Sequence, residues 1–236
     1  MPLGTVPFVP SGLLTRTPLW VSIVDHVHWK GSAALDQLLF GFDTAVYSFF
    51  WQLQNSVTIG IADVCQRLGD STAYITYFVI SLLLCIPKKT RKIGVAMTVS
   101  FLVALLLVNV IIKPAVGRLR PYIALKETSF WETYEAHWVA AGSHLETDAS
   151  FPSGHTSLNF AAFTALVAVL VKDKKKWAWF LLLIPVIVGI TRIIRCVHYP
   201  SDVVGGAIIG AIAGVIGYLV SAKVLPLLSR KSEPAK

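Results

Sequence analysis

The sequence is poor in charged residues. Only 14% of its 236 residues are charged, whereas 55% are hydrophobic and the mean hydropathy is +0.65. Soluble domains carry about 25% charged residues, so this composition excludes an ordinary soluble domain and predicts a membrane protein. The net charge is +8, but the basic residues lie in short clusters between apolar runs. That pattern fits membrane topology and anionic groups better than it fits nucleic acid, and we expect no nucleic-acid partner.

Cysteine is also scarce, and a leader pattern is missing. The three cysteines, Cys65, Cys85 and Cys196, have no paired spacing. The sequence therefore predicts neither a disulfide framework nor a zinc site. The first residues include several prolines and no basic region followed by an apolar core, so we expect no cleavable signal peptide. No internal repeat or low-complexity tract is visible.

Long apolar runs are what the sequence has instead. A bilayer core of about 30 Å needs about 20 apolar residues of helix. Five runs approach that length, at roughly 70–87, 93–112, 155–171, 177–194 and 203–225. The expected fold is all-α, a polytopic transmembrane helical bundle with five clear spans and room for a sixth.

The N-terminal third is harder to place because acidic and amide residues interrupt its apolar content. Segment 36–66 contains Asp36, Asp43 and Asp63. It forms either one or two helices in the outer interface or a sixth, polar span, and we favour the interfacial interpretation. We therefore expect two parts: interfacial helices or a polar first span within 1–69, and a membrane domain over 70–236.

Basic clusters predict the orientation of the bundle. Twelve of the 21 Lys and Arg residues lie in three clusters that the positive-inside rule assigns to the cytoplasm: Lys88, Lys89, Arg91 and Lys92; Lys172 and Lys174 to Lys176; Lys223, Arg230, Lys231 and Lys236. The opposite side then holds six more: Lys113, Arg118, Arg120, Lys126, Arg192 and Arg195. Basic residues in excess on the outer side require a different explanation.

Three segments on that outer side place basic or imidazole side chains where an apolar helix meets water. They are KPAVGRLRP at 113–121, FPSGHTS at 151–157 and TRIIRCVHYPSD at 191–202. Charged side chains that converge from three helix ends are suited to a multiply charged anion, for which phosphate is the natural candidate.

Each segment has chemistry suited to phosphate. Arginine offers a planar fork of donors and lysine a point charge, while Ser153 can cap a helix whose first N–H groups point at an anion. His198 and Asp202 are four residues apart, so on a helical turn the carboxylate can fix the imidazole tautomer. The other ring nitrogen is then free to attack phosphorus, and His155 can act as acid and then as base.

Taken singly, these features have simpler interpretations. Lys113 and Arg120 suit snorkelling anchors, the PSGH sequence suits a turn with an N-cap, and Asp202 suits a helix N-cap. Their conjunction on one predicted face favours the anion site. Gly206, Gly210 and Gly214 form a small-residue stripe, for which we favour packing within the bundle over dimerisation. The oligomeric state is left open.

The three segments resemble the signature motifs of the type-2 phosphatidic acid phosphatase superfamily, which includes bacterial lipid phosphatases, glucose-6-phosphatase and, more distantly, vanadium haloperoxidases. Lysine, six residues and Arg-Pro correspond to Lys113, Arg120 and Pro121, and Pro-Ser-Gly-His corresponds to 152–155. The third motif corresponds to Arg192, His198 and Asp202, with threonine at 191 in place of serine.

The resemblance implies a role for each matched residue. His198 would form a phosphohistidine, Asp202 would orient it, and His155 would be acid and then base. The phosphate would be held by Lys113, Arg120, Arg192, Ser153 and the Gly154 backbone. The family works without a metal, so no metal or other cofactor is expected. Arg118 and Arg195 lie outside the matched positions. We expect them to support the site residues from behind or to contact the head group, where they could hold the second phosphate of a diphosphate.

The expected function is hydrolysis of a membrane lipid phosphate or diphosphate at the outer surface of the cell membrane, in phospholipid metabolism or cell-wall biogenesis. Undecaprenyl diphosphate is the favoured substrate, because the stretch DASFPSGH resembles bacterial undecaprenyl-diphosphatases. The alternatives are a phosphatidylglycerophosphate or phosphatidate phosphatase, and a lipid phosphotransferase that uses the same site. The non-enzymatic alternative is an anion-binding transporter.

Overall fold

A computed structural model describes residues 30–68 and 70–231, and every regular element in them is a helix. This confirms the all-α prediction. The N-terminal and long bundle helices are α2 (Lys30–Trp51), α3 (Ser56–Gln66), α4 (Ser71–Leu84), α5 (Arg91–Leu105), α9 (Gly154–Lys172), α10 (Leu183–Ile194) and α11 (Pro200–Lys231). Shorter elements are the π-helix η1 (Leu106–Ile112), α6 (Lys113–Val116), α7 (Pro121–Ala124), α8 (Trp131–Ala140) and two 3₁₀ turns, η2 (Leu125–Glu127) and η3 (Lys176–Leu182).

Four helical stretches are long and apolar enough to cross a membrane, so the chain is a multi-pass membrane protein. They are Arg91–Glu127, Gly154–Lys172, Lys176–Ile194 and Pro200–Pro226, and they contain four of the five predicted spans. The fifth predicted span, 70–87, forms the shorter apolar helix α4, which ends at Leu84. Its 14 residues rise about 21 Å, less than the hydrocarbon thickness.

The glycine stripe lies inside the bundle. Helix α11 packs against α9 and α5, and its glycines face their backbones. A Cβ at Gly210 would lie 2.2 Å from the Ser157 carbonyl oxygen, and one at Gly217 would lie 2.3 Å from that of Ala96. Packing within the bundle, the interpretation favoured from sequence, accounts for the stripe, because any side chain there would separate the helices.

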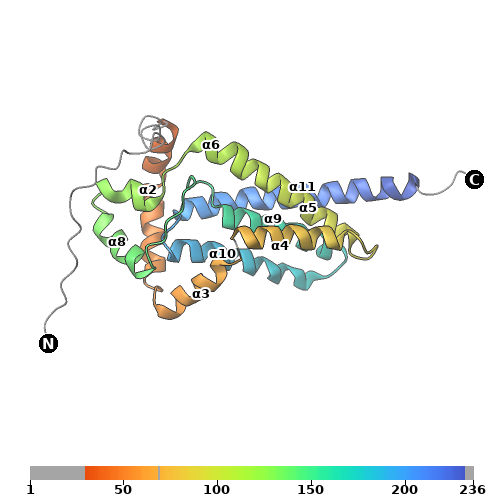
Figure 1. The fold of residues 1–236 in the computed structure, drawn as a ribbon, viewed down its shortest axis with the longest axis horizontal. Coiled ribbons are helices and arrows are strands. Elements are labelled where there is room, and N and C mark those ends of the chain that lie inside the picture. The colour runs from red at the N-terminus through yellow and green to blue at the C-terminus, as the bar shows by residue number, and fades with distance from the viewer. Residues whose placement is uncertain (1–29, 69, 232–236) are drawn as a thin grey trace, which may run out of the picture.

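Segment 36–66 forms two helices at one end of the bundle. Helix α2 runs across that end, transverse to the long helices, and α3 and α8 lie at the same end (Figure 1). Asn55 separates α2 from α3 and caps α3 through the backbone N–H groups of Val57 and Thr58. A transverse helix suits the interfacial interpretation better than the spanning one, although residues 1–29 lie outside the described part of the chain.

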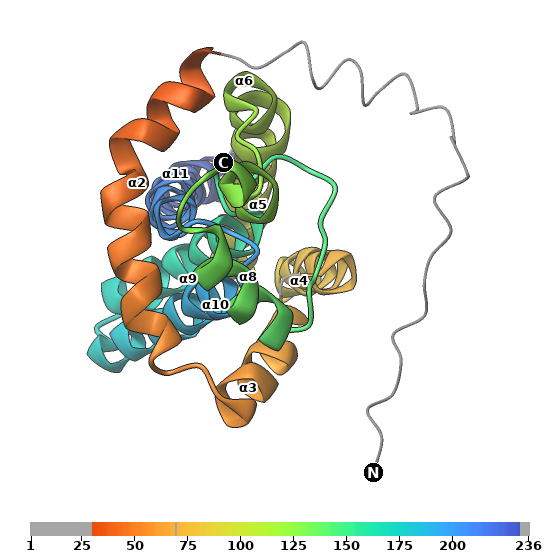
Figure 2. The same ribbon diagram turned by 90° about the vertical axis from the view of Figure 1, so that its left-hand side faces the viewer.

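The two ends of the bundle differ in content. The turn between α4 and α5, the turn between α9 and η3 and the later part of α11 lie away from α2 (Figure 1). Those segments carry the clusters that the sequence assigns to the cytoplasm, except for Lys236, which lies outside the described residues. The α2 end holds the three segments that resemble the phosphatase motifs. Viewed from that end, α2, α3 and α8 lie around the ends of the bundle helices (Figure 2).

Candidate active site

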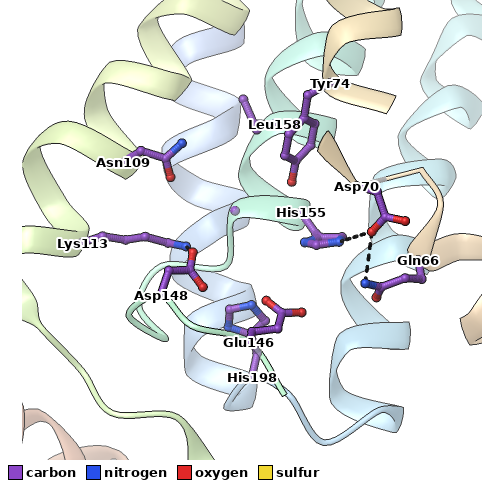
Figure 3. A pocket seen from close by; sticks show the side chains of 11 residues that line it. Gln66, Asp70, Tyr74, Asn109, Lys113, Glu146, Asp148, His155, Leu158 and His198 are labelled. Carbon is purple, nitrogen blue, oxygen red and sulfur yellow. Dashed lines mark hydrogen bonds and ion pairs between the residues drawn. The ribbon is translucent and has the colours of Figure 1, made fainter. Parts of the chain in front are cut away.

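The three predicted segments meet around one cavity of about 270 Å³ at the α2 end of the bundle. Lys113, His155 and His198 line this cavity and come from all three segments (Figure 3). Gly154, next to His155, also lines it. The remaining lining residues are Gln66, Asp70, Tyr74, Asn109, Glu146, Asp148 and Leu158. The predicted residues that are far apart in sequence therefore lie together.

His198 lies in the turn between α10 and α11 and is only 1% exposed. Its Nε2 lies 2.9 Å from Arg120 Nη1, and its Nδ1 lies 3.4 Å from Asp202 Oδ2. The second distance is long for a hydrogen bond, but the carboxylate is on the side expected for an orienting partner. Burial, with the charges of Arg120 and Arg192, lowers the pKa of His198 well below 6.5. The imidazole is therefore neutral at pH 7, as its predicted role as a nucleophile requires.

Asp202 lies in the first turn of α11 and is fully buried. Its Oδ2 accepts hydrogen bonds from the Ser150 hydroxyl and, at 3.0 Å, from the Tyr199 backbone N–H. Its Oδ1 accepts a bond of 2.6 Å from Arg118 Nη1. These bonds satisfy a buried carboxylate and fix its plane. Asp202 is thus the neighbour of His198 that the sequence suggested. It is not the helix N-cap, because α11 begins at Pro200 and Asp202 lies inside its first turn.

His155 lies at the start of α9, where Ser153 is the N-cap. The Ser153 hydroxyl oxygen accepts from the Thr156 backbone N–H at 3.5 Å and from its hydroxyl at 3.0 Å. The His155 Nε2 faces Asp70 Oδ1 at 3.7 Å across the cavity wall, and Gln66 donates to the same carboxylate oxygen at 3.1 Å (Figure 3). The two imidazoles thus project into one cavity from different helix ends.

The predicted phosphate-binding cations converge beside this cavity and pair with two carboxylates. Lys113 and Arg120 bind Asp148, and Arg192 binds Glu146. Arg120 also donates to Glu146 at 2.9 Å. Burial alone would raise the pKa of Asp148, but the charges of Lys113 and Arg120 outweigh it and lower the value to about 2. Asp148 is therefore anionic at any physiological pH, and the cations have the geometry to hold an anion.

Arg118 and Arg195 do not line the cavity. The Arg118 side chain is fully buried behind Asp202, and Arg195 binds Asp63 on α3. Arg118 therefore acts on the cavity only through the carboxylate of Asp202. Neither side chain is directed at the cavity, so the structure lends no support to their holding a second phosphate.

The residues missed from sequence are those that make up the rest of the cavity wall. Glu146 and Asp148 lie in the irregular segment after α8, where loop residues give no periodic signal. Asn109 is an exposed amide within η1, and it falls within the apolar run of the predicted span 93–112. A polar side chain in such a run is the signal that was available, and π-helical turns are frequent at functional sites.

Comparison with known proteins gives the family. Residues 89–225 match the PAP2 superfamily. An undecaprenyl-diphosphatase from Sulfolobus acidocaldarius is 30% identical over 172 residues, which are 72% of this chain and 74% of that protein. The bacitracin transport permease protein BcrC of Bacillus licheniformis is 38% identical over 79 residues, 34% of this chain and 37% of that protein.

A solved structure shares the fold. The transmembrane PAP2 type phosphatidylglycerolphosphate phosphatase from Bacillus subtilis superposes with a TM-score of 0.59 at 21% identity, over 92% of this chain and 96% of that one. The resemblance inferred from the three motifs is confirmed. Because the family match covers more than half of the sequence, the chain belongs to the PAP2 superfamily.

Proposed function

We propose that this protein removes a phosphate group from a membrane lipid phosphate or diphosphate through a phosphohistidine at His198. The observation that carries the proposal is that two imidazoles and Lys113 line one cavity at the ends of membrane helices. Arg120 and Arg192 lie behind the cavity wall and bind its carboxylates, Glu146 and Asp148. The sequence similarity to a protein named an undecaprenyl-diphosphatase supports the same reaction class.

The proposed reaction has two steps. His198 Nε2 attacks the terminal phosphorus, so that an N–P bond forms while the bond from that phosphorus to the leaving oxygen breaks. The leaving oxygen is the lipid oxygen of a monophosphate or the bridging oxygen of a diphosphate, and His155 donates a proton to it. His155 then takes a proton from water as the water attacks the phosphohistidine and releases inorganic phosphate. Asp202 holds the ring and stabilises its positive charge in the intermediate.

The cations would stabilise the transferring group. Lys113, Arg120 and Arg192 lie where they can replace their bonds to Glu146 and Asp148 with bonds to phosphate oxygens. Arg120 must also give up its contact with His198 Nε2, because the lone pair of that nitrogen makes the attack. Positioned cations in a water-poor site stabilise developing charge strongly, and in this proposal they take the role that a metal has in other phosphatases. We therefore propose a metal-independent enzyme, whose turnover persists in excess EDTA and is inhibited by vanadate.

The cavity fits a head group and not a lipid tail. Its volume of about 270 Å³ is just below the ligand-pocket range of about 300–1,000 Å³. The tail would therefore remain outside, among the helices or in the leaflet. We propose undecaprenyl diphosphate as the substrate because of the named relative and the DASFPSGH stretch. Arg118 and Arg195 do not contribute to this proposal, since they are not placed to bind a second phosphate.

Two further reactions fit the same residues. A phosphatidylglycerophosphate or phosphatidate phosphatase would need only a different head group. A lipid phosphotransferase would need an acceptor hydroxyl in place of water in the second step. We place the site on the extracytoplasmic side, because the exposed basic clusters lie at the other end of the bundle.

The test is phosphate release by the detergent-solubilised protein from undecaprenyl diphosphate, phosphatidylglycerophosphate, phosphatidate and glucose 6-phosphate under matched conditions with EDTA. We expect the highest kcat/KM for undecaprenyl diphosphate. A clear preference for phosphatidylglycerophosphate would overturn the choice of lipid alone. A preference for glucose 6-phosphate would overturn the lipid assignment, and binding without any turnover would favour the transporter alternative.

A further inference from the structure

Helix α2 lies outside the residues that match the family, yet one of its faces reaches the catalytic segment. Asp36, Asp43 and Tyr47 are spaced by seven and four residues, so they share one side of the helix. That side packs against the start of α11. The two elements lie next to each other in both views (Figures 1 and 2).

Asp43 is buried, at 1% exposure, and binds the first turn of α11 directly. Its Oδ1 accepts the Ser201 backbone N–H at 2.7 Å, and its Oδ2 accepts the Ser201 hydroxyl at 2.8 Å. A carboxylate at a helix N-terminus satisfies N–H groups that have no partner within the helix. Asp43 therefore holds the turn that precedes Asp202.

Arg118 connects Asp43 to Asp202. Its Nη2 lies 2.9 Å from Asp43 Oδ2, and its Nη1 lies 2.6 Å from Asp202 Oδ1. The guanidinium also stacks on the Tyr199 ring at 3.8 Å from the centroid and binds Asp36 through Nε at 2.7 Å. Because Arg118 occupies Oδ1 of Asp202, the carboxylate presents Oδ2 to His198.

Tyr47 makes a second connection from α2 to the catalytic turn. Its hydroxyl donates to the His198 backbone carbonyl at 2.7 Å, and the residue is fully buried. The ring is held independently, because it stacks on Trp51 at 4.9 Å and meets the edge of Tyr134 at 5.8 Å. Removing the hydroxyl alone would thus release His198 without emptying the core.

We propose that α2 is a positioning element of the active site, in which Asp43, acting through Arg118, and Tyr47 hold Asp202 and His198 in the geometry needed for attack on phosphorus. Neither α2 residue lines the cavity, so both act through other residues. The inference rests on the proposed role of His198 as nucleophile. It extends the catalytic unit beyond the family match, to a helix whose acidic residues have no other evident use.

The test compares Asp43→Asn and Tyr47→Phe in the full-length protein, with the lipid phosphate that the wild type hydrolyses fastest. A misplaced catalytic group costs up to about a hundredfold in rate. We expect Asp43→Asn to lower kcat by about ten- to a hundredfold and Tyr47→Phe by about three- to tenfold, each with KM within about twofold. The matched control is Asp63→Asn, which breaks the Arg195 ion pair away from the cavity and should leave kcat within about twofold.

The separation of kcat from KM identifies a positioning role, since a purely structural contact would change the amount of folded protein and neither constant. If Asp43→Asn does not fold, Tyr47→Phe decides the question, because it removes one oxygen and keeps the ring packing. A wild-type kcat for Tyr47→Phe would overturn the inference. His198→Ala in the same assay separates the two proposals: an inactive variant leaves the proposed function in place, whereas an active one removes it.

Discussion

The two ends of the bundle use the same basic residue types in opposite ways. At the end away from α2, residues such as Lys88, Lys89 and Lys175 are exposed. At the α2 end, five basic side chains are buried and each binds at least one carboxylate: Lys113, Arg118, Arg120, Arg192 and Arg195.

The difference reflects what each charge costs. An exposed lysine at the membrane–water interface keeps its hydration, so it can influence membrane topology without a carboxylate partner. A buried cation loses several kcal/mol of hydration and persists only with partners of good geometry. Natural chains keep such charges where function requires them. The contrast therefore separates the exposed basic residues, which we predict orient the protein, from a buried set that includes the proposed phosphate ligands Lys113, Arg120 and Arg192.

The largest expected effect follows from removing the proposed nucleophile, His198, at the buried end. His198→Ala should abolish phosphate release, with a loss of about 10⁶-fold in kcat, whereas Asp202→Asn should retain measurable turnover with a loss of about 10⁴-fold. Loss of the Asp202 carboxylate should lower kcat less than loss of His198, because the imidazole itself remains. Initial rates with the preferred lipid check this order, and a His198→Ala enzyme with near-normal turnover would contradict the mechanism.

A buried cation should be irreplaceable even by another cation. Arg192→Lys keeps the charge but loses the fork of donors, and we expect kcat to fall by about a hundredfold. Lys175→Arg, the reverse exchange at the exposed end, should leave kcat within about twofold. Equal effects of the two exchanges on kcat would contradict the proposed difference in function between the buried and the exposed basic residues.

The carboxylate partners should compete with phosphate. Asp148 is half exposed, with 52% of its side chain accessible, so its ion pairs are worth about 0.2–1 kcal/mol. Asp148→Asn would free Lys113 and Arg120, and we expect vanadate to inhibit that variant about two- to fivefold more tightly. Weaker inhibition would instead make Asp148 a residue that holds the cations in place for substrate.

The smallest effect on activity is expected from single cysteines that report topology. In a background with Cys65 and Cys85 replaced by serine, Ser143→Cys should react with an impermeant reagent applied to intact cells, and Lys175→Cys should not. Both should keep turnover within about twofold. The reverse labelling pattern would place the active site in the cytoplasm.

The sequence was most informative where chemistry and spacing coincide. The apolar runs predicted the long helices, and the three motifs located the residues that the structure brings together around the cavity. The helix at 70–87 is shorter than the apolar run predicted, because apolar composition continues past Leu84, where α4 ends before the turn at Pro87. Composition alone does not mark that end.

Long-range partners could not be read from sequence. Asp43 and Arg118 are 75 residues apart, and Asp36 and Arg118 are 82 apart. On the sequence the aspartates only interrupt an apolar segment. Their spacing on one helix face was a usable signal, since buried carboxylates need cations. Which cations they meet is set by the packing of α2 across the end of the bundle.

One measurement tests the central claim most directly: trapping of the covalent intermediate. The enzyme is mixed with substrate carrying ³²P in the transferred group, quenched in alkali within a single turnover, and digested for peptide mapping. We predict an alkali-stable, acid-labile label on His198 that is absent from His198→Ala and accumulates in His155→Ala if hydrolysis is slowed. Substrate turnover with no label on His198, or with the label on another residue, would contradict the proposed mechanism.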